Sequence, residues 1–262
     1  MSVAAVLLVT VLAQAPVSDP LVLPGYRLHL VVDESVEADA LRALAGSGTV
    51  LWLRTKSNTL RESTIEALAR FPEAYVQLRP PLKEAHVRQL RGAPRVGAWL
   101  EAQALSGPGL HWLGSRRAAV EIRGGLDAEL ARRVGALRPS RILWLPGASE
   151  VSLEAWGAFA QLPGSKLLAL AGALGPPCPE LPWRAALSTV SLRVEQGTGG
   201  ETCGLGQRVV MKGFPEEAAL VALLGQERPT ELELEVGTSP REVERARAWV
   251  QRLEAAVRGR SR

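Results

Sequence analysis

Short apolar runs alternate with amphipathic stretches along most of the chain. The runs predict ten β-strands, at residues 26–33, 49–54, 74–79, 95–101, 118–123, 141–146, 166–171, 189–195, 208–212 and 230–236. Between the runs, apolar residues recur at helical spacing, as Val36, Ala40, Leu41 and Leu44 do. This alternation predicts parallel strands joined by helical crossovers, which is an α/β architecture.

The spacing of the predicted strands is regular enough to indicate an internal repeat. Equivalent positions of the first eight strands lie 21 to 25 residues apart, at Val32, Leu53, Leu78, Leu100, Ile122, Leu145, Leu170 and Val194. Repeated βα units of about 23 residues fit two architectures. One is a TIM-barrel-like (βα)8 fold with extra C-terminal βα units, and the alternative is a leucine-rich-repeat-like α/β solenoid.

The two faces of the predicted strands help to choose between these architectures. One face is aliphatic and is expected under the helices, whereas the other becomes more polar toward the carboxyl end of each strand. A barrel predicts this gradient, because its functional sites lie at the carboxyl ends of the strands. Two features favour the solenoid: ten strands exceed eight, and Glu231, Glu233 and Glu235 give the last strand an acidic face. On balance we favour the barrel.

Charged side chains mark the carboxyl ends of five consecutive predicted strands. If the sheet closes, Asp33, Glu101 and Glu121 become candidate catalytic carboxylates for cleaving a glycosidic bond. Glu101 is the first candidate for the acid, because Trp99 lies two residues earlier on the same face. The candidate ligand-binding residues are Trp52, Arg54, Arg79, Trp99, Arg123 and Trp144. The alternative interpretation is structural: a ladder of salt bridges above a core of tryptophans.

The amino terminus resembles a secretory signal peptide. Residues 3–12 form a ten-residue apolar run, and Ala13-Gln14-Ala15 supplies the small residues of a cleavage site. No Lys or Arg precedes the run, so a buried first strand or helix is the alternative. We expect a signal peptide at 1–15, a single βα-repeat domain at 16–262, and a periplasmic or secreted protein. No later apolar stretch is long enough to predict an integral membrane segment.

The cysteines, histidines and net charge indicate which covalent links, metal sites and nucleic-acid partners to expect. Cys178 and Cys203 lie in turn-rich segments, so an oxidising compartment predicts a disulfide between them. The chain has three histidines and no paired C-x-x-C motif, which predicts no metal and no cofactor. The net charge of +4 comes with no basic run interleaved with aromatics, so we expect no nucleic-acid partner.

These observations lead to two functional hypotheses. The first is an exported protein that binds a glycan or another cell-envelope ligand at the carboxyl ends of its strands. The sequence does not decide whether such a protein would also hydrolyse the ligand, as a glycoside-hydrolase-like barrel does. The second is a non-catalytic repeat scaffold for protein–protein recognition, with a concave strip of Trp, Arg and Glu side chains exposed on an open sheet.

Overall fold

Ten parallel strands form one closed sheet in the computed structural model. The structure describes residues 26–106, 108–147, 151–169, 190–195, 205–211, 213–214 and 230–260. The strands are β1 (Tyr26–Asp33), β2 (Thr49–Arg54), β3 (Glu73–Leu78), β4 (Val96–Glu101), β5 (Ala118–Arg123), β6 (Arg141–Leu145), β7 (Ser165–Leu168), β8 (Val190–Glu195), β9 (Gly206–Met211) and β10 (Thr230–Glu235). The expected signal peptide at 1–15 and the expected Cys178–Cys203 disulfide lie outside the described residues.

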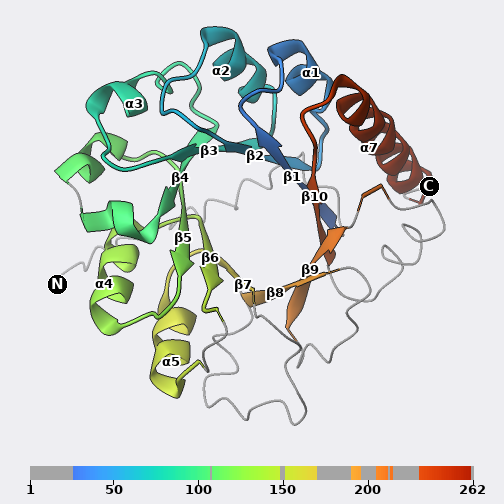
Figure 1. Cartoon of the computed structure of the whole chain (residues 1–262). Coiled ribbons are helices and arrows are strands. Elements are labelled where there is room, and N and C mark those ends of the chain that lie inside the picture. Colours follow the sequence, from blue (N-terminus) through green and yellow to red (C-terminus); the bar gives the residue numbers. More distant parts are fainter. Residues whose placement is uncertain are drawn as a thin grey trace, which may run out of the picture.

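The described helices surround the ring of strands on its outside (Figure 1). They are α1 (Ala38–Ala43), α2 (Glu62–Leu68), α3 (Glu84–Arg88), α4 (Ala128–Leu137), α5 (Leu153–Gln161) and α7 (Pro240–Arg260), with two 3-10 helices, η1 (Ala102–Ser106) and η2 (Pro108–Leu113), after β4. The Asp127 and Ser152 side chains accept hydrogen bonds from the first turns of α4 and α5, which fixes where these helices begin. Within the described part of the chain, no helix is long and apolar enough to cross a membrane.

The strand order confirms the prediction of a TIM-barrel-like α/β fold. Each strand pairs in parallel with its sequence neighbours, and β1 pairs with β10. The two C-terminal units therefore belong to the ring, with β9 and β10 inserted between β8 and β1. The leucine-rich-repeat-like solenoid is wrong, because the closed sheet leaves neither a free edge nor an open concave face.

Aliphatic side chains cover the outer surface of the barrel. Leu30, Leu51, Val76, Leu100 and Ile122 project from successive strands toward the helices and are fully buried. Each of them belongs to the larger of the two apolar clusters, which contains residues from both strands and helices. Burial of this continuous layer is the main favourable contribution to folding.

The interior of the barrel is filled by aromatic and charged side chains. A ten-stranded ring is wider than an eight-stranded one, so larger side chains are needed to fill it. Trp52 stacks on Tyr75 with ring centroids 4.6 Å apart, and its edge contacts Trp99 at 5.4 Å. Val31, Val50 and the other members of this smaller cluster complete an apolar layer in the middle of the barrel.

The predicted faces of β6 are wrong. The register Glu121↔Leu143 turns Leu143 inward, so Trp144 points outward and packs on Trp156 and Phe159 of α5. Only 1% of Trp144 is exposed, and its indole N–H donates to the Gly124 carbonyl. The sequence Arg-Ile-Leu-Trp-Leu is apolar on both faces, so its alternation carries little information about orientation.

Candidate functional site

Buried ion pairs occupy the amino-terminal half of the barrel, below the aromatic layer. Arg141 of β6 reaches Glu73 of β3 with two hydrogen bonds, Nε to Oε1 at 2.7 Å and Nη2 to Oε2 at 2.8 Å. Tyr75 donates its hydroxyl to the same carboxylate. Burial raises the pKa of Glu73, but the hydrogen bonds and charge of Arg141 outweigh it and lower this pKa to about 2.

The acidic face of β10 belongs to this network. Glu231 accepts from Arg208 Nε at 2.8 Å, and Glu233 accepts from Arg193 Nη2 at 2.7 Å. The acidic face of this strand, which in the sequence favoured the solenoid, fits inside the barrel because β8 and β9 supply matching guanidinium groups. Burial opposes ionisation of Glu231, but Arg208 holds its pKa well below the usual range.

His29 of β1 lies fully buried between the aromatic layer and the ion pairs. Its Nδ1 accepts the indole N–H of Trp52 at 3.0 Å, so the neutral ring carries its proton on Nε2. That Nε2 lies 3.2 Å from Glu231 Oε2. Burial, assisted by the charge of Arg208, lowers the pKa of His29 to about 4. These contacts make His29 part of the structural network.

The predicted site residues on β1 to β5 do share one rim of the barrel. The register places Asp33 beside Arg54 and Glu101 beside Glu121. Asp33 Oδ1 lies 3.9 Å from Lys56 Nζ, and Arg54 forms an ion pair with Glu235 of β10. Among the described residues, no ion pair joins two members of the salt-bridge ladder that was the alternative interpretation (Asp33, Arg54, Arg79, Glu101 and Arg123), and Arg54 instead pairs across the β1–β10 closure.

Among the candidate catalytic residues, Glu101 and Glu121 lie directly beside each other on neighbouring strands. They are Cα partners on β4 and β5, so their side chains leave the sheet on the same face. Glu121 is 2% exposed, and its two oxygens accept from Trp99 Nε1 at 3.1 Å and Arg123 Nε at 2.7 Å. Glu101 is partly exposed and lies 3.5 Å from Gln77 Nε2. Trp99 therefore donates its indole N–H to Glu121, whereas the sequence suggested Glu101 as the carboxylate beside it.

The candidate ligand-binding residues divide into three groups. Trp52 and Trp99 are each 8% exposed, and their rings contact one another, so they belong to the barrel core. Trp144 lies outside the barrel. Arg54, Arg79 and Arg123 have exposed side chains at the ends of β2, β3 and β5. Arg54 is paired with Glu235 and Arg123 with Glu121, so among the described residues Arg79 is the rim arginine without an ion pair. No tryptophan platform remains at this rim.

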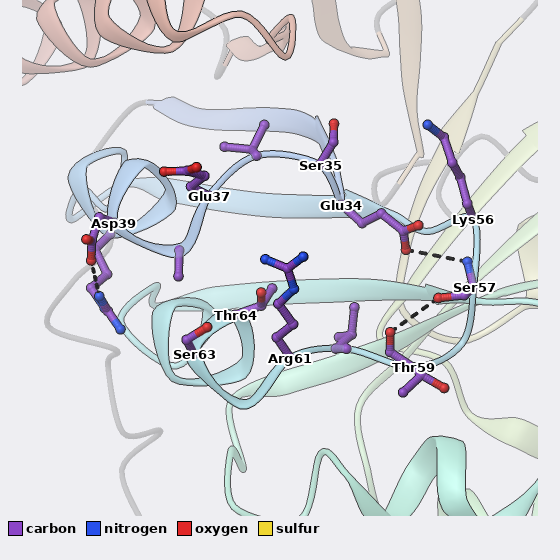
Figure 2. Close-up of a pocket in the computed structure, with 14 residues that line it drawn as sticks. Glu34, Ser35, Glu37, Asp39, Lys56, Ser57, Thr59, Arg61, Ser63 and Thr64 are labelled. Atoms are coloured by element: carbon purple, nitrogen blue, oxygen red, sulfur yellow. Dashed lines mark hydrogen bonds and ion pairs between the residues drawn. The ribbon is translucent and has the colours of Figure 1, made fainter.

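A pocket of about 560 Å³ adjoins the rim beyond β1 and β2 (Figure 2). Its walls are the β1–α1 and β2–α2 loops, which are connected where the Ser57 N–H donates to Glu34 Oε2 at 3.4 Å. Charged and hydroxyl side chains line it, among them Glu37, Lys56 and Arg61. No sequence pattern indicates this pocket, because polar residues in loops are common and only the fold shows that these face one another.

Two further results bear on the identity of the site. Among the described residues, no three His, Cys, Asp or Glu side chains come together as metal ligands. No protein-family model matches the chain, and no curated protein is significantly similar to it.

Proposed function

We propose that the protein binds a glycan or another cell-envelope ligand at the carboxyl ends of β1 to β5. The observation that carries the proposal is the convergence of carboxylates and exposed arginine side chains on one rim of a closed barrel, where barrel proteins place their sites. Arg79 and Arg123 offer N–H donors to hydroxyl and carboxylate groups. A protein-recognition strip is less well supported, because closure of the sheet buries Trp52 and Trp99.

Hydrolysis of the ligand is a second candidate activity, favoured by the register of Glu101 and Glu121. Both Glu121 oxygens accept hydrogen bonds, which suits a nucleophile, and partly exposed Glu101 suits the acid that protonates the leaving oxygen. Retaining glycosidases separate their carboxylates by about 5 Å and inverting ones by about 6.5 to 9.5 Å, so the anomeric configuration of the product would report the spacing of the two groups during catalysis.

Binding is tested by calorimetry with a panel of soluble glycans and cell-envelope polysaccharide fragments. Arg79→Ala should weaken binding about tenfold, because it removes a charged donor from the rim. Arg70→Ala is the matched control, since Arg70 is equally exposed and lies beyond α2, outside the rim. If no glycan of the panel binds the unmodified protein, the proposal is wrong.

Hydrolysis is tested with the same panel by release of reducing ends. Glu101→Gln and Glu121→Gln should each lower turnover by about 100-fold or more, while Glu154→Gln on the surface of α5 should not. Binding without turnover in the unmodified protein would leave glycan binding standing and exclude the hydrolase.

Export remains part of the proposal. The apolar run at 3–12 and the small residues after it support a cleaved leader. The mass of the protein recovered from a secreting host tests it, because removal of the leader shortens the chain by about 13 to 15 residues. Recovery of the chain with Met1 intact would contradict export by this route.

A further inference from the structure

Opposite charges face one another across the pocket beside β1 and β2 without pairing. Figure 2 shows Arg61 projecting from the start of α2 into the opening, with Glu37 and Glu34 on the facing wall. The Arg61 and Glu37 side chains form no ion pair with any described residue, whereas nearby Asp39 is paired with Arg42. One cation and one anion are therefore left available in the same pocket.

The surroundings of these charges form a half-open pocket with fixed walls. Its inner wall includes Val36 and Thr64, both buried. The β1–α1 loop is fixed by the Ser35 N–H, which donates to Asp33 Oδ1 at 3.1 Å, and by the Glu34 N–H, which donates to the Arg54 carbonyl at 2.9 Å. The pocket volume of about 560 Å³ lies in the range of small-molecule sites.

The opposite wall is held equally firmly. Asn58 exchanges two hydrogen bonds of 2.7 Å with the backbone of Arg79, and the Leu60 N–H donates to Gln89 Oε1 at 2.9 Å. These contacts fix the β2–α2 loop to the end of β3 and to the residue that follows α3. The wall that presents Arg61, Ser57 and Thr59 is thus positioned before any ligand arrives.

We infer that this pocket is a separate binding site for a small zwitterionic molecule, one that carries both a carboxylate and an ammonium group. Arg61 would receive the carboxylate in a charge-assisted, two-pronged hydrogen bond. Glu37, with Glu34 beside it, would receive the ammonium. The hydroxyl groups of Ser35, Ser57 and Thr59 provide further donors and acceptors around the ligand.

The test measures binding of L-alanine, β-alanine and γ-aminobutyrate by ligand-observed NMR, since these probes carry the same two charges at increasing separation. At least one should bind about tenfold more tightly than propionate and propylamine, which carry a single charge each. Arg61→Gln and Glu37→Gln should each abolish that preference. Neither side chain caps its helix, so both variants should fold.

Three controls keep this test independent of the barrel rim. Arg70→Gln and Glu62→Gln change exposed charges at either end of α2 that do not line the pocket, and they should leave the preference intact. Glu101→Gln should also leave it intact, whatever its effect on a glycan. Failure of all three zwitterions to bind at millimolar concentration would overturn the inference, and so would propionate binding as tightly as they do.

Discussion

Glu73 and Arg141 face each other across the barrel interior from strands that are not neighbours, and two hydrogen bonds of 2.7 and 2.8 Å connect them. The contact joins β3 to β6, with β4 and β5 between them in the ring. It converts two isolated charges, which would be costly inside a protein, into one neutral buried group. The pair therefore helps to specify which side chains fill the lumen.

Replacement of Arg141 with Met should destabilise the protein by about 3 to 5 kcal/mol, because it leaves the Glu73 carboxylate buried without its principal partner. Urea unfolding measures the change. Arg132→Met breaks an exposed pair with Glu129 on α4 and should cost less than about 1 kcal/mol. Adding Glu73→Leu to the Arg141 variant should recover stability. Equal costs for the Arg141 and Arg132 variants would mean that the buried pair has no special role.

Stability should fall as the pH decreases from about 6.5 to about 4, because the pKa of His29 is lowered to about 4 by burial and by Arg208. In that interval the unfolded chain binds a proton at His29 and the folded protein does not, so acid favours unfolding. The loss attributable to His29 is about 3 kcal/mol.

The His29 contribution is isolated by comparing His29→Gln with His111→Gln, which alters an exposed histidine on η2. Urea unfolding across this pH range should give a flatter profile for His29→Gln alone. Parallel profiles for the two variants would show that His29 does not carry the effect. A further decline toward pH 2 is expected in every variant that retains Glu73, whose pKa of about 2 lies below its unfolded value.

Gly97 on β4 should be sensitive to substitution, because a Cβ there would lie 2.8 Å from the Tyr75 ring and 2.9 Å from the Arg117 carbonyl oxygen. Gly97→Ala is expected to destabilise the protein by about 1 to 3 kcal/mol through overpacking. Gly92→Ala provides the comparison, since nothing lies within 4 Å of its added methyl group. Thermal unfolding should separate the two. A neutral Gly97→Ala would imply that the aromatic layer is loosely packed.

Most of the strand positions could be predicted from the sequence, because the apolar runs are short and evenly spaced. The run at 26–33 coincides with β1, and the run at 118–123 coincides with β5. The limits of β3, β7 and β9 differ from the predicted runs by one to three residues. The α/β class follows from this repeat, whereas the choice between a barrel and a solenoid depends on the pairing of β1 with β10.

The contents of the barrel were harder to predict, because they depend on pairs of residues far apart in the sequence. The sequence alone does not explain a buried Glu233, because its partners Arg193 and Arg208 lie on β8 and β9. Trp144 looks like an inner residue until the pairing of β5 with β6 fixes its direction. The local alternation of residues shows that two faces exist, whereas only the register with a neighbouring strand shows which side chains point into the barrel.

The candidate site was predicted in part. The rim positions of Glu101, Glu121, Asp33 and Arg123 follow from their places at the ends of consecutive strands. The roles of Trp52 and Trp99 could not be inferred in the same way, because exposure depends on how fully the ring of strands is filled. The pocket beside β1 and β2 could not be predicted, because it depends on how the β1–α1 and β2–α2 loops face one another.

The central claim, that a ligand binds at the rim formed by the carboxyl ends of β1 to β5, is tested most directly by the indole N–H resonances of Trp99 and Trp144. Trp99 donates to Glu121 inside the barrel, and Trp144 donates to Gly124 outside it. Titration with glycan or cell-envelope fragments should shift the Trp99 resonance and leave Trp144 unchanged. Binding that shifts Trp144 and leaves Trp99 unchanged would contradict the account.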